Sequence, residues 1–357
     1  MDNEQLIKNA AAAIGMGQLD DYKIAPTTHA DSLEATAAVL SKILRGSQLG
    51  TTASQYEEKD LAATEAQTVF REIAKRANWA VFLTSCLSAA LLIVSLLVPH
   101  SKWLLVTLGG CGILSGALGA MWLFEIRQGN LLEVWMTGRA RAEAERLKYF
   151  ELATLSVENS ESEGIPLPLL QLEYFRRYQL DVQRAYYRKR RKDHKLAADK
   201  FLTLGAYAVG LGALATGFGG ILGGALNSKW ACLAGLATVA SALSAFASTN
   251  EALGQDRRNE ELYGKTNDAL ADLAAKLDEV RAAAVKGDRE SLKQFVAAVH
   301  EQLSLEHKQW LDSAANRATS LAKLDEALAA SKSKSTEPNA AAPSPVAPVA
   351  PSEGTSR

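Results

Sequence analysis

The chain has 357 residues, enough for two or three soluble domains, and its formal net charge of −1 says little because the charges are segregated by region. Its three cysteines, Cys86, Cys111 and Cys232, all lie in apolar runs, which excludes a disulfide framework and the cysteine spacings typical of metal sites. This usage is expected of a protein whose soluble parts face a reducing cytoplasm.

Residues 1–53 predict a helical head. The motif DSLE at 31–34 has the pattern of a capping box, so we expect a helix from there to about Arg45. A second capping box, SQYE at 54–57, predicts the start of a helix that runs through Arg76 directly into an apolar run.

Two uncharged apolar runs, 79–98 and 103–124, are separated by a short turn. A run of about 20 apolar residues is long enough to cross the hydrocarbon layer as a helix, and lipid does not tolerate exposed irregular backbone. The pair therefore predicts an antiparallel membrane hairpin. Basic residues flank the hairpin on the side that should stay cytoplasmic: Arg71, Lys75, Arg76, Arg127, Arg139 and Arg141.

Residues 125–155 are charged and rich in Ala and Leu, and they predict a helix that leads the second span away from the membrane. The periodicity then breaks over 156–166, where Ser, Glu and Gly gather. Pro166 and Pro168 disfavour helix at the residues before them. We therefore expect a linker over 156–166 and one long helix over 169–200.

A second pair of uncharged apolar runs, 201–226 and 230–249, is joined by three polar residues and repeats the hairpin layout. The basic run before it predicts the same orientation. Lys and Arg near anionic lipid are each worth about 1 kcal/mol, so contact with membrane lipids and orientation alone explain the run. Contact with a nucleotide or a nucleic acid is the sharper alternative, supported by Tyr186 and Tyr187, although we expect no nucleic-acid partner. The assigned residues are Arg188, Lys189, Arg190, Arg191, Lys192 and Lys195.

Beyond the second hairpin, apolar residues recur in alternating steps of three and four, which is the pattern of an a/d seam. Gly287 and Asp288 end this helix, and a second apolar-faced helix follows. The two should fold back on each other or on a neighbouring chain, and we assign the seam to an oligomer contact. Residues 331–357 are rich in Pro, Ala and Ser and predict disorder. The seam residues are Leu270, Leu273, Leu277 and Val280.

Together these elements predict an all-α membrane protein with four spans and long cytoplasmic helices that form a stalk. Buried helices of a soluble core are the alternative for any one span, but four matching runs with basic flanks disfavour it. The chain then divides into the head, a first two-span unit (54–155), the linker, a second two-span unit (167–330) and the tail. We expect a multi-pass protein of the inner membrane with both termini in the cytoplasm.

The spans contain closely spaced glycines, eight of them between residues 201 and 226. Small residues four apart let helix backbones approach in lipid. Packing within each hairpin explains most of them, and packing between subunits around a pore is the functional alternative. The marked residues are Gly112, Gly116, Gly219, Gly220, Gly223 and Gly224.

The sequence offers no recognisable catalytic chemistry. It has no P-loop, no HExxH and no GxSxG motif, so we predict that the protein is not an enzyme and assign no catalytic, cofactor or metal residues. His300 and His307 share a helix face, but solvated surface histidines are the simpler interpretation. No span contains a charged residue, which argues against an ion-coupled transporter.

Three stretches resemble SLATT domains. WMTGRARAEAERLKYF (135–150) is similar to the helix after the hairpin in one SLATT type. YFRRYQLDVQRAYYRKRRKDHKLAADKF (174–201) resembles the helix before the hairpin in a second type, and VAAVHEQLSLEHKQWLD (296–312) resembles the end of that domain. The resemblance covers about 56–311, as two different SLATT units fused in one chain, and rests on helix pattern and layout.

The resemblance implies a function that composition does not. SLATT proteins are two-span effectors of bacterial conflict systems, encoded beside nucleotide second-messenger synthases or sensors, and are thought to permeabilise the inner membrane when triggered. We therefore expect a homo-oligomeric, pore-forming antiviral effector with a nucleotide-signal synthase or sensor encoded nearby. The alternative is a scaffold that recruits a cytoplasmic partner through the 250–330 helical hairpin. An enzyme on a membrane stalk has no motif in its favour.

Overall fold

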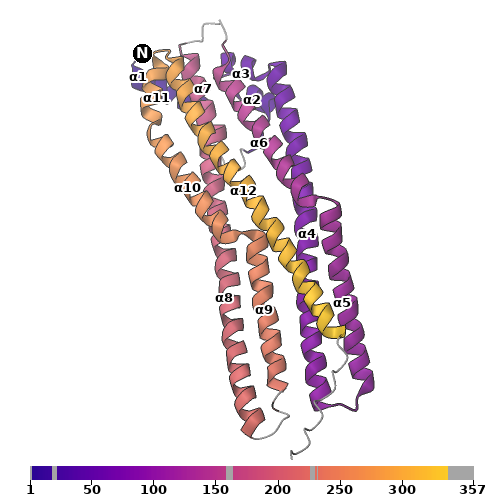
Figure 1. The fold of residues 1–357 in the computed structure, drawn as a ribbon. Helices are drawn as coiled ribbons and strands as arrows, with labels where there is room; N and C mark the ends of the chain where they lie inside the picture. The colour runs from indigo at the N-terminus through magenta and orange to yellow at the C-terminus, as the bar shows by residue number, and fades with distance from the viewer. Residues whose placement is uncertain (1, 18–21, 158–163, 226–229, 231, 337–357) are drawn as a thin grey trace, which may run out of the picture.

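The computed structural model describes residues 2–17, 22–157, 164–225, 230 and 232–336, and the fold is all-α with 90% helix, as predicted. The helices form two long hairpins that extend toward the same end of the molecule, while the short helices and the N-terminus lie at the opposite end (Figure 1). The long helices α4 and α8 each pass without interruption from the helical stalk into an apolar segment.

The head is helical, but its boundaries differ from the expected ones. It consists of α1 (Asn3–Ile14), α2 (Pro26–Leu33) and α3 (Ala38–Leu44). The predicted helix start at 31–34 was wrong because α2 begins at Pro26, whose fixed φ suits the first helical turn. Instead of capping a helix, the Asp31 carboxylate accepts a hydrogen bond from Arg45 at 2.9 Å.

The first hairpin is made by α4 (Ser47–Leu97) and α5 (Lys102–Gln128). Since α4 begins at Ser47, the second expected capping box at 54–57 lies inside a helix. An α-helix rises about 1.5 Å per residue, so α4 is about 75 Å long and extends well beyond a hydrocarbon layer of about 30 Å. After α5, Asn130 adopts a left-handed φ of 44°, and α6 (Leu131–Leu155) then runs beside α4.

The second half begins with α7 (Leu167–Phe175), two residues before the predicted helix start, because Pro168 fits the first turn of the helix. A six-residue π-helix, η1 (Arg176–Asp181), joins it to α8 (Val182–Ala225). The chain returns through α9 (Leu233–Gly254) and, past a left-handed Gln255, through α10 (Asp256–Ala275). The last two helices are α11 (Leu277–Val285) and α12 (Arg289–Thr336).

Three helical stretches are long and apolar enough to span a membrane: α4, α5 and the continuous stretch of α7, η1 and α8 that ends at Gly224. They coincide with three of the four predicted spans. The fourth, expected over 230–249, corresponds to α9, which is not among these three. The structure therefore supports three of the four predicted spans. Residues 226–229 and 231, which join α8 to α9, lie outside the described ranges.

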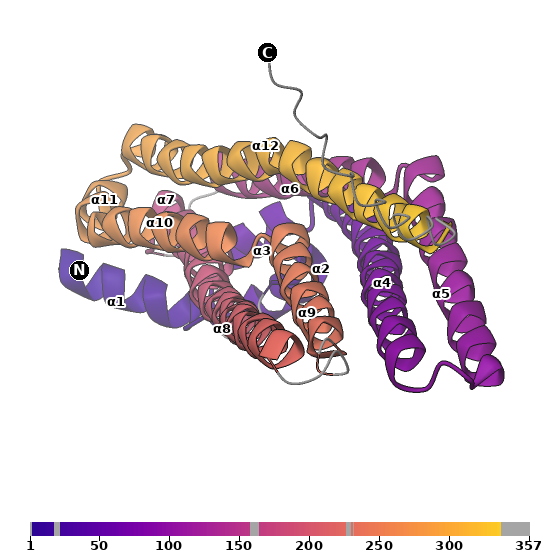
Figure 2. The ribbon, with the colours of Figure 1, turned by 60° about the horizontal axis from the view of Figure 1, so that its bottom comes forward.

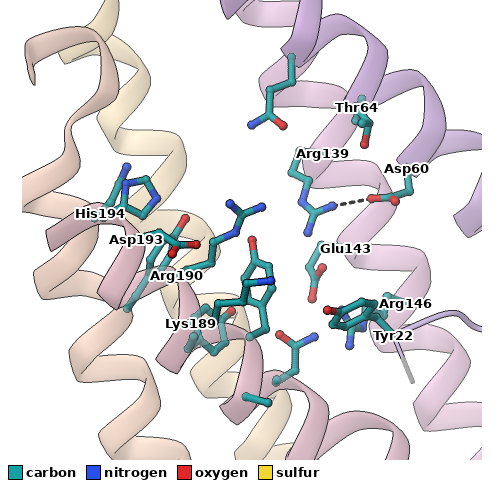
Figure 3. Close-up of a pocket in the computed structure, with 18 of the residues that line it drawn as sticks. Tyr22, Asp60, Thr64, Arg139, Glu143, Arg146, Lys189, Arg190, Asp193 and His194 are labelled. Carbon is teal, nitrogen blue, oxygen red and sulfur yellow. Dashed lines mark hydrogen bonds and ion pairs between the residues drawn. The ribbon is translucent and has the colours of Figure 1, made fainter. Parts of the chain in front are cut away.

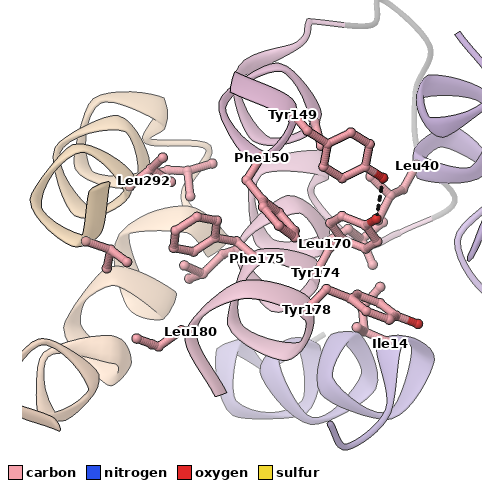
Figure 4. Packing of buried hydrophobic residues seen from close by; sticks show 14 of the residues in the cluster. Ile14, Leu40, Tyr149, Phe150, Leu170, Tyr174, Phe175, Tyr178, Leu180 and Leu292 are labelled. Atoms are coloured by element: carbon pink, nitrogen blue, oxygen red, sulfur yellow. Dashed lines mark hydrogen bonds between the residues drawn. The ribbon is translucent and has the colours of Figure 1, made fainter. Parts of the chain in front are cut away.

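The main core lies at the end of the molecule opposite the hairpin tips. Tyr149, Phe150, Tyr174 and Phe175 are almost completely buried there, among residues of α1, α3, α11 and α12 (Figure 4). The Tyr149 and Tyr174 hydroxyl groups lie 2.7 Å apart. This core joins the head, the first half and the second half into one body.

A smaller core lies nearer the membrane, where α12 crosses the first hairpin. Leu321 and Leu324 of α12 are buried among residues that include Phe70 and Leu123. In the view from the hairpin tips, α12 lies across α6 toward α5 (Figure 2). Arg127 pairs with Asp325 at 2.9 Å and ties α12 to the end of α5.

Two C-terminal expectations can be compared with the structure. Leu270 and Leu277 of the predicted seam are buried in the main core, and Leu273 and Val280 pack against it. The helices thus fold back on their own chain, which is one of the two arrangements that the sequence allowed. The tail was expected to begin at residue 331, but α12 continues to Thr336, and residues 337–357 lie outside the described ranges.

Candidate functional site between the two stalks

A cavity of about 520 Å³ lies between the two halves, on the stalk side of the apolar segments (Figure 3). Four helices contribute most of its wall: α4 and α6 from the first half, and α8 and α10 from the second. These are the four helices that lead into or out of the two hairpins. The site is therefore built where movement of one hairpin against the other would change its width.

The lining residues recur at helical spacing. On α4, Tyr56, Asp60, Gln67 and Arg71 follow steps of four and seven, which places them on one face. The other three helices repeat the pattern. The corresponding residues are Trp135, Arg139, Glu143 and Arg146 on α6, Tyr186, Lys189, Arg190, Asp193 and His194 on α8, and Asn259 and Tyr263 on α10.

The cavity is positively charged. Five cationic side chains line it against three carboxylates. Arg139 of α6 neutralises one of these carboxylates, because it donates a hydrogen bond to Asp60 of α4 at 2.5 Å. Burial alone would lower the pKa of Arg139, but the negative charges of Glu143 and Asp60 outweigh it and raise that pKa above its ordinary value. The Arg139 side chain is thus held in the wall of the cavity by its ion pair with Asp60.

Arg146 closes the end of the cavity nearest the main core. It is buried, and its Nε donates to the Gln179 side chain at 3.0 Å, which connects α6 to η1. Gln183 lies one helical turn further along, against the Arg146 guanidinium. This end of the cavity is therefore held together by hydrogen bonds between the two halves.

Three cations remain available. Within the described part of the chain, Arg71, Lys189 and Arg190 form no ion pair. Arg71 lies over the Trp135 ring at 5.6 Å, and Arg190 lies over the Tyr186 ring at 5.4 Å. Surrounding protein and the positive charge of Arg190 lower the pKa of Arg71, although water reaches its side chain through the cavity. The two guanidinium groups approach the cavity from opposite halves without a carboxylate partner.

The α8–α10 wall is aromatic. Tyr186, Tyr187 and Tyr263 form a cluster with ring centroids 5.4 to 6.5 Å apart. His194 packs against Tyr263 at 5.4 Å, and its Nδ1 lies 2.6 Å from the Asp256 carboxylate. The cavity thus combines guanidinium groups from both halves with the ring faces of the α8–α10 wall.

One buried polar atom of the residues that line the cavity has no partner in the described structure. Asn259 is 3% exposed and donates its amide to the Gly254 carbonyl at 3.0 Å, but its Oδ1 accepts no hydrogen bond in the described structure. A buried acceptor without a donor costs about 1–3 kcal/mol. Asn259 lines the cavity, but its Oδ1 has almost no accessible surface, so a bound molecule would reach this atom only if the side chain rotated.

The structure also contains a buried charge network that sequence analysis missed. Glu173 is fully buried and accepts from Arg176 and from Arg281, each at 2.6 Å. Arg176 also pairs with Asp181 at 2.7 Å and donates to the Gly15 carbonyl at 3.0 Å. The network anchors η1 to α1 and α11. Its members are far apart in sequence, and only the pair Glu173–Arg176 had a helical spacing that could have identified it.

The predicted basic run divides between two environments. Lys189 and Arg190 line the cavity, whereas Arg191 lies against Gly264 of α10, where an added Cβ would meet its guanidinium at 3.2 Å. The remaining residues of the run, Arg188, Lys192 and Lys195, are exposed. The run therefore does not act as one surface.

The predicted packing glycines also divide. Gly112 and Gly223 are half-buried, and Gly116 and Gly219 are buried. A Cβ at Gly112 would touch Leu87 at 3.8 Å, which is ordinary packing within the first hairpin. In contrast, nothing lies within 4 Å of a Cβ at Gly220 or Gly224. Packing within one chain therefore does not explain these two glycines.

The two hairpins meet along α4 and α9. Phe246 packs against Trp79 at 4.7 Å and Phe82 at 5.2 Å, and its carbonyl accepts from the Asn78 amide at 3.3 Å. Further toward the tips, Gly235 lies directly against Ile93 and leaves no room for a Cβ. Small residues at such a contact let the helix backbones approach.

The described residues contain no group of three or more His, Cys, Asp or Glu side chains that could bind a metal ion. His300 is not a solvated surface residue as expected but packs at 5.7 Å from Phe175. Burial lowers its pKa from 6.5 to about 4. The side chain of His307 lies outside the described ones.

Comparison with known proteins assigns the second half of the chain. Residues 175–310 match the model of the SMODS and SLOG-associating 2TM effector domain 1, and the first half, expected as a second unit, is not matched. No curated protein and no solved structure matches the chain. SLATT domains are effectors of conflict systems that associate with SMODS and SLOG nucleotide-signalling proteins. From Phe175 at the end of α7 into the first half of α12, the chain is therefore similar to a SLATT_1 domain.

Proposed function

We propose that this protein is a membrane effector of a bacterial anti-phage or conflict system, which assembles into oligomers and permeabilises the inner membrane on a signal from a partner or a nucleotide. The observation that carries the proposal is the SLATT_1 match over the second hairpin and its stalk. The three helices that are long and apolar enough to cross a membrane, one of which overlaps the matched region, support a membrane protein.

The packing of α9 supports a fourth span. It lies alongside the apolar part of α4 from Ile93 to Trp79, through Gly235 at one end and Phe246 at the other. If α4 crosses the bilayer, a helix packed along that length lies in the same layer. The basic flanks then place both termini in the cytoplasm.

The outward glycines of α8 support assembly. Gly210, Gly217, Gly220 and Gly224 all have open space where a Cβ would stand. Steps of seven connect three of them, so they share a face that no described helix of the same chain covers. In lipid, such a face gains most from contact with another protein surface.

A leakage assay tests the proposal. Purified protein is added to vesicles of phosphatidylethanolamine and phosphatidylglycerol at rising protein-to-lipid ratio, so that mass action favours assembly, and carboxyfluorescein release is measured. Gly220→Leu should insert normally but lose leakage and large oligomers, because its side chain would separate neighbouring subunits. An unchanged leakage rate for this variant would exclude the glycine face as a subunit contact.

The matched control is Gly212→Leu on the same helix. A Cβ at Gly212 already meets the Ala240 Cβ at 3.2 Å, so this change should destabilise the α8–α9 hairpin and lower protein levels. If wild-type protein releases no dye at any ratio, the permeabilising function fails.

The alternative function, a scaffold that recruits a partner through the 250–330 helices, has less support. The apolar seam on which it rested is buried in the protein's own core. For the same reason we do not carry the seam forward as an oligomer contact.

A further inference from the structure

We propose that the cavity between the two stalks binds a phosphorylated nucleoside, with its phosphate between Arg71 and Arg190 and its base against the tyrosine wall. This inference rests on the proposed function in one respect, since it assigns the signal to a site on the effector itself. The binding site can be tested without any measurement of permeability.

The charge of the cavity selects an anion. Arg71 and Arg190 come from opposite halves and lack carboxylate partners in the described structure, and Lys189 adds a third cation. Guanidinium groups bind phosphate oxygens in a bidentate manner. A phosphate between them would relieve their mutual repulsion, which adds to burial in lowering the pKa of Arg71.

The aromatic wall selects a planar group. Tyr56, Tyr186 and Tyr263 line the cavity, and Tyr22, which is 41% exposed, lies beside Arg146 at its edge (Figure 3). Stacking of a base on an aromatic side chain is worth about 1–3 kcal/mol. An inorganic anion would leave this part of the cavity unused.

Size and hydrogen bonding fit the same ligand. The cavity of about 520 Å³ lies within the range of small-molecule sites. The unpartnered Oδ1 of Asn259 has almost no accessible surface, so it would accept from a ribose hydroxyl or a base amino group only after its side chain rotates toward the cavity. Glu143 and Asp193 also line the cavity. Their carboxylates would repel additional phosphate groups on the ligand, so the cavity favours a ligand of limited negative charge.

The position of the site connects binding to the hairpins. The phosphate would join α4 to α8, whose apolar segments are candidate spans. A ligand shifts a conformational equilibrium only if it prefers one of the two states. Bridging two guanidinium groups from separate helices creates such a preference, because the bridge forms only when the stalks stand at one separation.

Binding is measured on the full chain in phosphatidylcholine nanodiscs with N-methylanthraniloyl-AMP as the fluorescent probe, because its single phosphate has the limited negative charge that the cavity favours. Unlabelled AMP, ATP and a cyclic dinucleotide are the competitors, with adenosine and pyrophosphate as the half-ligands. We expect saturable binding, displacement by at least one nucleotide, and at least tenfold weaker displacement by adenosine or pyrophosphate.

Three variants locate the site. Arg71→Gln and Arg190→Gln should each weaken probe binding at least tenfold without loss of folding, because neither side chain forms an ion pair that would be broken. Tyr22→Ala should weaken binding of the nucleotide but not of pyrophosphate. The matched control is Arg188→Gln, which removes the same charge from an exposed position two residues away and should leave binding unchanged.

Several results would overturn the inference. They are absence of saturable binding, equal loss with Arg188→Gln, or equal competition by pyrophosphate, which would indicate a simple anion site. Displacement of the probe by phosphatidylglycerol in the nanodisc, without displacement by nucleotides, would assign the cavity to a lipid headgroup. Nucleotide binding without dye leakage would support the binding site and contradict the pore-forming function. Dye leakage without nucleotide binding would support the pore-forming function and contradict the binding site.

Discussion

At the scale of single residues, the polar groups of the stalk fall into two kinds. Glu173, Arg139 and Arg146 are committed to partners inside the protein and stabilise its shape. Arg71 and Arg190 have aromatic neighbours but no counter-charge in the described structure. Breaking a buried ion pair costs several kcal/mol, so the first kind should be sensitive to any substitution and the second tolerant of it.

His300 predicts how stability depends on pH. Its pKa is lowered from 6.5 to about 4 in the folded state, chiefly by burial. The unfolded chain therefore binds a proton at higher pH than the folded one, so stability is complete above about pH 6.5 and is lost as pH falls toward 4. Linkage gives a loss of about 2 kcal/mol between pH 7.5 and pH 5.

The measurement is thermal unfolding in detergent across that pH range, comparing wild type with His300→Leu. The variant removes the titrating group and its buried Nε2, which has no hydrogen-bond partner in the described structure. Its melting temperature should change less between pH 7.5 and pH 5. Parallel pH profiles for the two proteins would show that His300 is not the source of the acid sensitivity.

At the scale of helices, the sequence predicted which segments are helical better than it predicted where each helix begins and ends. The apolar runs predicted their helices because lipid leaves a spanning backbone few alternatives. The capping boxes failed because a Ser or Asp in the right motif competes with stronger local signals, such as Pro26 at the first turn of α2. The π-helix η1 had no sequence signal that we recognised.

Gly235 gives a prediction about the contact between helices α4 and α9. Gly235→Ala places a Cβ into the Ile93 side chain, so it should destabilise the protein by about 1–3 kcal/mol through overpacking. Gly210→Ala is the matched control, because its Cβ meets nothing within 4 Å and alanine favours helix over glycine.

Thermal unfolding in detergent compares the two. We expect a lower melting temperature for Gly235→Ala and an equal or higher one for Gly210→Ala. Equal behaviour of the two variants would mean that the hairpins do not meet at Gly235.

At the scale of the whole molecule, the cavity illustrates what sequence could not provide. The polar residues at steps of three and four were visible on 56–71, 135–146 and 183–194. Many solvated helices have such faces, however, and periodicity does not say which face turns inward. The convergence of four faces from distant segments depends on how the two hairpins pack, and that is a tertiary property.

The orientation of the chain in the membrane gives the prediction at this scale. With the three native cysteines replaced by alanine, a single cysteine at Ser101, in the turn between α4 and α5, should react with a membrane-impermeant maleimide added to intact spheroplasts. A cysteine at Glu290, at the start of α12, should react only after the membrane is permeabilised. The opposite pattern would invert the orientation inferred from the basic flanks.

The unbroken length of α4 has a mechanical consequence. Arg71 at the cavity and Leu97 at the hairpin tip belong to one helix of 51 residues and lie 26 residues apart, a lever arm of about 40 Å. A tilt of about 5° at the cavity would displace the far end by about 3 Å, roughly the width of a water molecule. In the proposed function, the stalk would act as a lever, in which a small rotation at the cavity becomes a displacement large enough to admit or exclude water at the hairpin tip.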